Sequence, residues 1–322
     1  MAKQVFNKPP LTQQQIVDLL ARRGLPLDQP DALARAHRAL ATIGYFRLSG
    51  YMLPYQRGGG TPRRHEFHRN ATIDKILDLY DFDTALRAHI GIALEPIEVA
   101  FRTSICDTLS RQSRNAHWIN DEANFAPDKQ LSHYETFAKA ADYDLVNRRP
   151  MEKIGSHEFI TQYYSRYHTP AIPPGWMTRE CVTFTSWSRL FGDLLPKDQR
   201  LVCENWRFPD QTSIDHSVFS GWIRSLGGLR NRCAHHSRIT NHKFTFSPRT
   251  TKNESVSFLF TKNTNDLRTI IVIITILMKH IAPNNRWLEG LKSIMVMYEP
   301  TVFVASATGF ADDYKADPLW AL

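Results

Sequence analysis

The sequence predicts an all-α protein, and two observations carry that prediction. Apolar residues recur at helical spacing over several long stretches, and helix-capping residues stand at their ends. Alternation of the kind found in strands is confined to residues 243–262, where we expect one small β-hairpin. The expected architecture is therefore a helical bundle with additional helices near its N-terminus.

The first helices are short. Thr12 is the expected N-cap of a helix over residues 13–23 that ends at Gly24, and residues 31–42 form a second helix. A loop rich in glycine and arginine follows at residues 57–64, and it is expected to be irregular.

The clearest helical pattern runs over residues 72–113. Its apolar residues recur every three or four positions, which predicts a long helix with a buried face. Pro96 lies inside this pattern and should kink or split the helix near Glu95, because proline has no N–H to donate. Residues 115–175 predict irregular connections around short helices. Further helices are expected over residues 177–192, 212–237, 265–281 and 286–297.

Bulk properties indicate a soluble, cytoplasmic protein. The chain has 322 residues, of which 42% are hydrophobic and 22% charged, as is ordinary for a globular protein. No signal peptide is recognisable, and the apolar run Ile270–Met278 is far shorter than the roughly 20 residues that a membrane span needs. Scattered cysteines without a CxxC pair indicate reduced thiols. They are Cys106, Cys181, Cys203 and Cys233.

The formal charge of +8 is concentrated near the N-terminus. Residues 1–70 contain eleven Lys or Arg and four Asp or Glu, so they carry 11 − 4 = +7. This basic segment predicts a polyanionic partner, with a merely solvated surface as the alternative. Residues 71–322 form a second region, either separate from the first or continuous with it. The arginines expected to contact nucleic acid are Arg47, Arg57, Arg63, Arg64 and Arg232.

The most informative run extends from Leu229 to Arg238. It places Arg230, Asn231 and His235 at helical spacing, and it contains no acidic residue. Histidine can move a proton and arginine can hold a charged phosphate, which is the chemistry of cutting a phosphodiester without a metal. We therefore interpret these three residues as candidate catalytic groups of a ribonuclease.

Helical geometry divides this run into two faces. At about 100° per residue, Asn231, His235 and Arg238 lie opposite the apolar stripe, whereas His236 leans toward it. His235 is therefore the expected catalytic histidine, with His236 and Arg238 in supporting roles. A polar helix face without a ligand is one alternative. A metal site is another, with Cys233, His235, His236 and His242 as candidate ligands.

Two adjacent glycines, Gly227 and Gly228, directly precede the run. Each should cost a helix roughly 1 kcal/mol relative to alanine. They predict either a helix break at this point or the close approach of another backbone, or of RNA, to the helix surface.

Several segments resemble the Abi family, the AbiD/AbiF-like abortive-infection proteins of bacteria. The run from Arg230 to Arg238 resembles the family's signature and contains the Arg-x4-His pattern that marks the HEPN superfamily. Pro96 departs from the resemblance, because a helix former is expected at that position. The resemblance spans nearly the whole chain. Its other segments are residues 43–51, 79–83, 93–98 with 102–103, 176–180 and 309–320.

The resemblance implies an all-α HEPN core over residues 71–322 and a metal-independent endoribonuclease without a cofactor. The activity implied is that of a toxin that serves phage defence and has RNA as its substrate. In some members of the family, a small RNA inhibits the toxin. A homodimer is implied, in which one His235 accepts the 2′-OH proton and the other protonates the leaving oxygen. Arg230 would stabilise the phosphate charge, and Asn231 would orient His235 or the phosphate. The alternatives are a non-catalytic protein that binds a regulatory RNA and a helical protein–protein interaction module.

Overall fold

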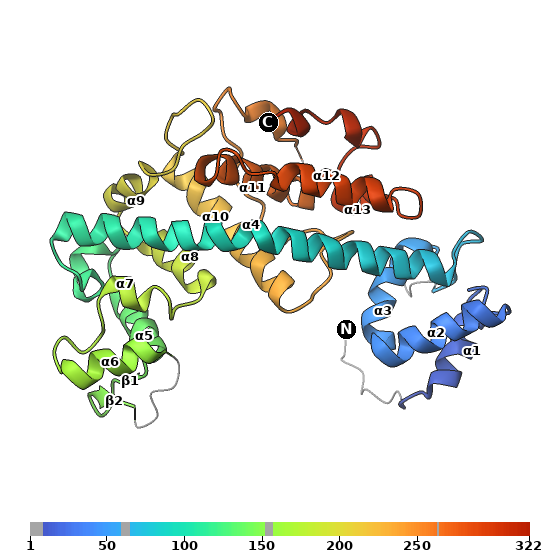
Figure 1. Ribbon diagram of the computed structural model, residues 1–322, viewed down its shortest axis with the longest axis horizontal. Coiled ribbons are helices and arrows are strands. Elements are labelled where there is room, and N and C mark those ends of the chain that lie inside the picture. The colour runs from blue at the N-terminus through green and yellow to red at the C-terminus, as the bar shows by residue number, and fades with distance from the viewer. Residues whose placement is uncertain (1–8, 59–64, 152–156, 263) are drawn as a thin grey trace, which may run out of the picture.

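One long helix, α4 (Ile73–Ser113), runs through the whole molecule and supports the elements around it (Figure 1). The computed structural model describes residues 9–58, 65–151, 157–262 and 264–322. These residues form thirteen α-helices and one two-stranded ladder, which confirms the all-α prediction. The side chain of Thr72 accepts the N–H of Lys75 and so caps α4 at its start.

The helix α4 continues through Pro96, so the predicted alternative of a split near Glu95 is wrong. Proline inside a helix costs roughly 3 kcal/mol, because one hydrogen bond of the ladder is lost. Leu94 and Ile97 beside it are buried, as are side chains on every later turn of the helix. Burying one large aliphatic side chain contributes about 1.5–3 kcal/mol. The packing of α4 on both sides of Pro96 therefore outweighs the cost of the proline.

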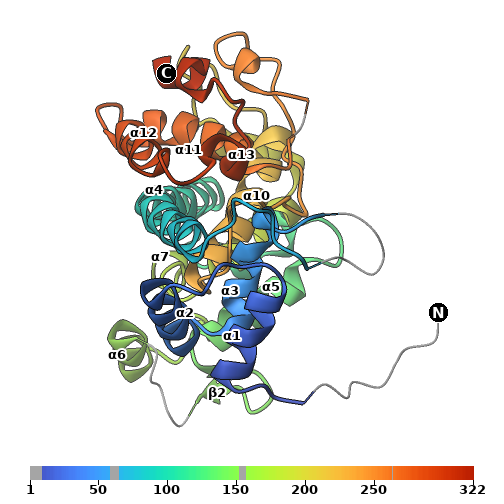
Figure 2. The same cartoon turned by 90° about the vertical axis from the view of Figure 1, so that its right-hand side faces the viewer.

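Three short helices form a lobe under one end of α4, which we call the N-terminal lobe (Figures 1 and 2). They are α1 (Gln13–Arg22), α2 (Pro30–Thr42) and α3 (Tyr45–Met52). Thr12 caps α1 as predicted, in a reciprocal capping box with Gln15. Apolar side chains of all three helices join the same core as those of α4.

A second lobe lies under the opposite end of α4, and we call it the middle lobe (Figure 1). It contains the helices α5 (Gln130–Ala140) and α6 (Glu158–Arg166) with the antiparallel strands β1 (Tyr143–Asp144) and β2 (Arg149–Pro150). This agrees with the irregular region and short helices predicted between residues 115 and 175.

The chain returns from the middle lobe to α4 through two helices, α7 (Gly175–Thr178) and α8 (Phe184–Asp193). The single helix predicted over residues 177–192 is therefore wrong. Thr183 is the reason, because its backbone is extended and its side chain accepts the N–H of Ser186, which starts a new helix.

The remaining helices cover the upper side of α4 (Figures 1 and 2). They are α9 (Pro196–Cys203), α11 (Leu267–Ile281), α12 (Trp287–Tyr298) and α13 (Val304–Thr308). Every residue of α11 from Leu267 to Met278 is buried, as its apolar run predicted. Among the described residues, no helix has both the length and the apolar character to cross a bilayer. Short 3-10 helices span Leu53–Tyr55, Trp118–Asn120, Glu122–Asn124, Ser257–Leu259, Tyr314–Ala316 and Pro318–Ala321.

The hairpin predicted within residues 243–262 does not form. The described part of this segment contains turns and one 3-10 helix. Phe244 and Val256 are buried, whereas Phe246 and Phe258 are exposed, so the alternating residues do not share a common buried face. The alternation belongs to an irregular chain, in which Phe260 stacks on Trp222 and Phe246 lies against Arg224.

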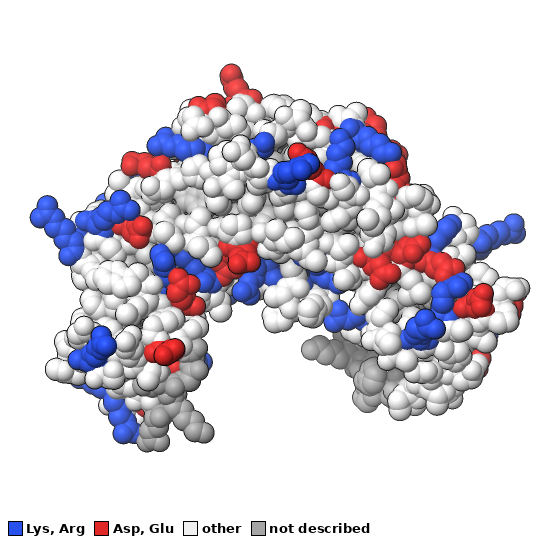
Figure 3. Space-filling view, in the orientation of Figure 1, with Lys and Arg blue, Asp and Glu red and all other residues white. Residues whose placement is uncertain are grey.

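The helix α10 (His216–Ala234) crosses α4, and its C-terminal end emerges below α4 between the two lobes (Figure 1). Figure 3 shows that the molecular surface is hollowed there, with Lys and Arg side chains beside Asp and Glu along the upper edge of the hollow. Phe101 of α4, Phe191 of α8 and Phe219 of α10 pack edge to face, with ring centroids 5.6–5.8 Å apart. This aromatic contact fixes the crossing and so places the end of α10 in the hollow.

Candidate functional site

The helix α10 ends inside the run of residues that the sequence singled out. Ala234 is its last residue and His235 is the C-cap. His236 follows in the left-handed conformation, with φ +54°. The N–H of His236 donates to the carbonyl of Cys233, and the N–H of Ser237 donates to that of Arg232. This is a Schellman termination, and it ends the helix three residues before the predicted boundary at residue 237.

Arg230 is held by a carboxylate on α4. Its Nε lies 3.3 Å from Oε2 of Glu98, and the other carboxylate oxygen of Glu98 binds Arg102, one turn further along α4. Glu98 is 8% exposed, whereas the side chain of Arg230 is 39% exposed. Burial lowers the pKa of Arg102, and the charge of Glu98 opposes this effect. Glu98 thus joins two cationic side chains at the crossing of two helices.

The outer edge of the Arg230 guanidinium faces an open groove. Within the described residues, the terminal nitrogens of Arg230 have no hydrogen-bond partner in addition to the Nε contact. The groove has a volume of about 590 Å³, and Arg87, Glu98, Arg102 and Cys233 are among its lining residues. An arginine with a fixed Nε and free terminal nitrogens can still grip a phosphate with two parallel hydrogen bonds.

His235 is exposed at the end of the helix, as the sequence predicted for a catalytic histidine. Its imidazole has no hydrogen-bond partner within the described part of the chain, so the ring is available to a ligand. Asn231 does not orient this ring. The Nδ2 of Asn231 donates to Oγ1 of Thr185 on α8, 3.0 Å away, and only its backbone carbonyl contacts the N–H of His235.

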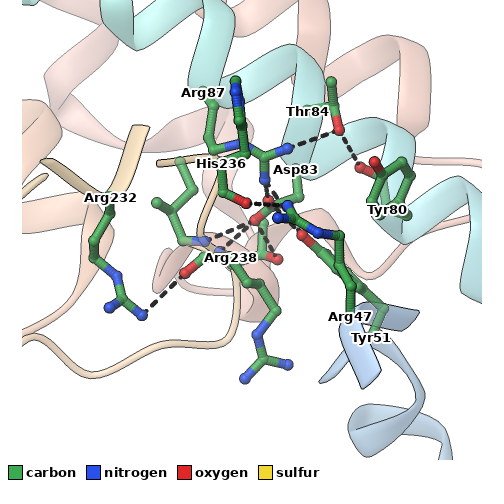
Figure 4. Close-up of polar contacts among 11 residues, drawn as sticks. Arg47, Tyr51, Tyr80, Asp83, Thr84, Arg87, Arg232, His236 and Arg238 are labelled. Carbon is green, nitrogen blue, oxygen red and sulfur yellow. Dashed lines mark hydrogen bonds and ion pairs between the residues drawn. The ribbon is translucent and has the colours of Figure 1, made fainter. Parts of the chain in front are cut away.

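His236 lies on the surface, so the prediction that it leans toward the core is wrong. The prediction assumed an unbroken helix, but the left-handed backbone at His236 turns its side chain outward. Its backbone carbonyl accepts a hydrogen bond from Nη1 of Arg47 on α3, at 2.5 Å (Figure 4). Arg47, which was expected to contact nucleic acid, thus ties the N-terminal lobe to the helix end.

A buried carboxylate, Asp83 of α4, anchors the chain that follows the motif (Figure 4). Its Oδ1 accepts the backbone N–H groups of Ile239 and Thr240, at 2.9 and 2.8 Å. Its Oδ2 accepts the hydroxyl of Tyr51 at 2.9 Å and forms an ion pair with Arg87. Asp83 is fully buried, so these donors replace the water that its charge would otherwise bind.

Arg238 and Arg232 contact other parts of the protein. The guanidinium of Arg238 donates to the carbonyl of Gly50 and lies 6.0 Å from the ring centre of Tyr51. Arg238 therefore supports the site through α3, away from Asn231 and His235. Arg232, an expected RNA contact, is half-buried, and its Nη2 donates to the Arg238 carbonyl and to Nδ1 of His242, at 3.2 and 3.3 Å.

The ring of His242 is neutral at physiological pH. Burial and the neighbouring charges of Arg232 and Arg238 lower its pKa to about 4. Burial raises the pKa of the Cys233 thiol to about 11. The alternative metal site would need these two residues as ligands, but one of them faces a guanidinium and the other is held as a neutral thiol. Among the described residues, no three His, Cys, Asp or Glu side chains form a cluster able to hold a metal.

The two glycines before the motif lie inside α10, so the predicted alternative of a helix break there is wrong. A Cβ atom at Gly227 would lie 3.9 Å from Oγ1 of Thr185, so α8 packs closely at this point. A Cβ at Gly228 would meet no atom within 4 Å. A Cβ at Gly227 would thus make ordinary van der Waals contact with α8, and Gly228 faces open space.

Of the three arginines in the N-terminal loop that were expected to contact RNA, Arg57 is among the described residues. Arg57 is exposed, and its Nη1 lies 3.9 Å from a carboxylate oxygen of Glu66. Arg63 and Arg64 lie outside the described residues.

Sequence reasoning assigned no role to Glu98, Asp83 or Thr185. A signal for the first two was present, because Asp83 with Arg87 and Glu98 with Arg102 form acid–arginine pairs four residues apart within the apolar pattern of one helix. Charged pairs at positions that should be buried indicate a buried polar site. Thr185 carried no comparable signal.

Comparison with known protein families matches residues 38–241 to the family described as Abi-like protein. The matched range begins within α2 and contains α3, α4 and α10, which together supply the site. The chain matches no curated protein and no solved structure. Because the family match covers more than half of its length, this chain belongs to the Abi-like protein family.

Proposed function

We propose that this protein is a metal-independent endoribonuclease of the HEPN type. Its family supports a role in abortive infection, a bacterial defence against phage. One observation carries the enzymatic part of the proposal. At the end of α10, Arg230 is restrained through Nε with its outer nitrogens free, and His235 five residues further on is exposed and unbound.

The proposed reaction is attack of a ribose 2′-OH on the adjacent phosphorus. His235 accepts the 2′-OH proton, and Arg230 stabilises the negative charge that develops on the phosphate oxygens. The bond from phosphorus to the 5′-oxygen breaks, which leaves a 2′,3′-cyclic phosphate and a 5′-OH. DNA is not a substrate, because it has no 2′-OH.

The leaving 5′-oxygen needs a proton donor, and one His235 cannot accept and donate in the same step. His242 is a poor acid, because its lowered pKa keeps the ring neutral near neutral pH, without the acidic proton of an imidazolium. We therefore propose a homodimer that brings a second His235 to the site. Exposed apolar side chains beside the groove support a second copy there, since Ile92 and Val99 of α4 are 64% and 52% exposed.

The test is incubation of the purified full chain with mixed-sequence RNA in the presence of EDTA. The expected products carry 2′,3′-cyclic phosphate and 5′-OH ends, and the His235→Ala variant produces none. Cleavage by His235→Ala at the parent rate would contradict the assignment of this site. Cleavage that is lost in EDTA and restored by a divalent ion would favour the metal alternative. Tight binding of RNA without any cleavage would favour the non-catalytic RNA-binding alternative.

The dimer is tested by mixing chains. Parent chains mixed with an excess of His235→Ala chains should lose more activity than dilution alone predicts, because mixed dimers lack one histidine. Activity proportional to the amount of parent chain would show that each chain acts alone.

A further inference from the structure

A second polar pocket lies against the N-terminal half of α10, on a different side of the helix from the Arg230 groove. Its volume is about 320 Å³. Side chains with hydroxyl, imidazole and guanidinium groups face it, and the residues used below are His216, Ser217, Ser220, Arg224 and Arg249. Such donors, gathered in one concave site, suit an oxyanion.

The two arginines of this pocket are not neutralised by an acid. Within the described residues, neither Arg224 nor Arg249 forms a salt bridge with Asp or Glu. Arg224 is exposed and lies over the ring of Phe246, with its guanidinium carbon 5.8 Å from the ring centre. The acid nearest to Arg224 in sequence is Asp215, whose Oδ1 caps the start of α10 through the N–H groups of residues 217 and 218 and whose Oδ2 lies 3.5 Å from Nδ1 of His216.

Arg249 belongs to an irregular segment, but its backbone is fixed on α10. The indole N–H of Trp222 donates to the carbonyl of Arg249 at 2.8 Å. The backbone nitrogen of Arg249 would lie only 3.5 Å from a Cβ atom on Gly221. The pocket is therefore lined by α8, α9, α10 and the segment around Arg249, and the backbone of its second arginine is held on α10.

The pocket lies along the same face of α10 as His235, whereas Arg230 lies to one side of that face. At about 100° per residue, Arg224, Gly228, Asn231 and His235 fall within about 60° of one another around the helix axis. Arg224 and His235 are eleven positions apart, which corresponds to about 16 Å along the axis. This distance suits a few nucleotides of a single strand.

Gly228 lies on this same face, midway between the pocket and His235. Among the described residues beyond its own turn of helix, no atom comes within 4 Å of the position of its absent Cβ, so no contact there requires glycine. Glycine weakens a helix relative to alanine. A ligand backbone that passes close to the helix surface is one physical reason for a glycine at an open position.

We propose that the Arg224–Arg249 pocket binds a phosphate of the RNA strand that is cut at His235, and that the strand passes over Gly228. This inference rests on the proposed ribonuclease function and adds a subsite to it. The ligand is a phosphodiester of single-stranded RNA, and Phe246 beside Arg224 offers a ring on which a neighbouring base can stack.

The test measures the binding of single-stranded RNA oligonucleotides of increasing length to the full chain carrying His235→Ala, so that no cleavage occurs. Arg224→Ala and Arg249→Ala should each weaken binding of the longer oligonucleotides. The slope of log affinity against log salt concentration should become shallower by about 0.7 for each phosphate that the protein no longer neutralises. Dinucleotide binding should be unchanged. The matched control is Arg286→Ala, since the side chain of Arg286, the N-cap residue before α12, is 84% exposed.

Substitution of Gly228 gives an independent measurement. Gly228→Ala should raise the melting temperature, because alanine favours the helix and meets no neighbour, while Gly228→Gln should weaken RNA binding at least tenfold. Gly228→Gln that folds and binds RNA as tightly as the parent would overturn the proposed path of the strand.

The outcomes separate this inference from the proposed function. If the parent cleaves RNA while Arg224→Ala and Arg249→Ala bind long oligonucleotides like Arg286→Ala, the subsite is wrong and the ribonuclease assignment stands. If the parent cleaves no RNA but the two variants still lose binding of long oligonucleotides, the ribonuclease assignment fails and the phosphate pocket is retained.

Discussion

The Nε atom of Arg230 lies 3.3 Å from a carboxylate oxygen of Glu98, a residue 132 positions earlier in the chain. The contact joins α10 to α4 at the edge of the groove, and Arg102 binds the same carboxylate. Arg230 is thus oriented by a buried acid and keeps its outer nitrogens for a ligand. The proposed phosphate grip depends on this restraint, because a flexible arginine would lose side-chain entropy on binding.

Glu98→Gln tests this restraint. Glutamine keeps the size of the side chain but removes the negative charge that Arg102 and Arg230 share. We expect RNA cleavage to fall by about 10²-fold, as when one stabilising donor is misplaced. The free energy of unfolding should fall by about 1–3 kcal/mol, because buried charged donors lose their acceptor. Steady-state kinetics and urea denaturation measure the two effects.

The matched control is Glu95→Gln on the same helix, since Glu95 is exposed and also lines the groove. It should change stability by no more than about 0.5 kcal/mol. Equal activity of Glu98→Gln and the parent would show that Arg230 needs no orientation by Glu98.

His236→Gly tests whether His236 acts through its backbone alone. A residue other than glycine in the left-handed region costs roughly 1–2 kcal/mol, and His236 has φ +54°. His236→Gly should therefore preserve or raise the free energy of unfolding, by up to about 1 kcal/mol. Cleavage should continue, because the carbonyl that binds Arg47 remains. A variant that folds but no longer cleaves would assign the His236 imidazole to the chemistry.

Asp83→Asn tests the anchor below the motif. The substitution removes the charge that pairs with Arg87 and weakens the acceptor for the N–H groups of Ile239 and Thr240. Breaking a buried ion pair from one side costs about 3–5 kcal/mol, and we expect this loss in urea denaturation. The control is Asp107→Asn on the same helix. Its carboxylate is 48% exposed, so its pair with Arg111 should contribute no more than about 1 kcal/mol.

The helices that the sequence predicted well are those with a local signal. Thr12 caps its helix as predicted, the long helical pattern from residue 72 to 113 is one helix, and the apolar run of α11 is buried as expected. Pro96 misled the prediction, because its local cost is outweighed by packing with segments far away in sequence. The alternation within residues 243–262 misled it too, because two-residue periodicity arises in an irregular chain as well as in a strand.

Only the site residues that belong to the run at the end of α10 could be predicted from the sequence. The spacing of Arg230 and His235 was sufficient to single them out, and the structure places both where a ligand can reach them. Their partners could not be derived, because Glu98 and Thr185 reach α10 only through the crossing of three helices. The position of His236 was wrong for a local reason. The Schellman turn depends on a left-handed residue, and histidine in that conformation has no clear sequence signal.

The last prediction concerns acid stability and follows from His242. Its Nδ1 accepts a hydrogen bond from the guanidinium of Arg232 at 3.3 Å, so a proton at Nδ1 would face a positive charge. Its pKa is about 4 in the folded protein and about 6.5 in the unfolded chain. Between these values the unfolded chain binds a proton that the folded protein does not. The free energy of unfolding therefore falls as the pH is lowered through this window.

His242→Gln should reduce this loss, since glutamine can accept the hydrogen bond of Arg232 and does not titrate. The pKa values of His89 and His117 are also lowered by burial, so part of the acid sensitivity remains in the variant. Urea denaturation of parent and variant across this pH window measures the difference. We expect the two curves to diverge as the pH falls below about 6.5, with the variant the less sensitive. Parallel curves would mean that His242 gains a proton as readily in the folded protein as in the unfolded chain, and that Arg232 does not restrain it.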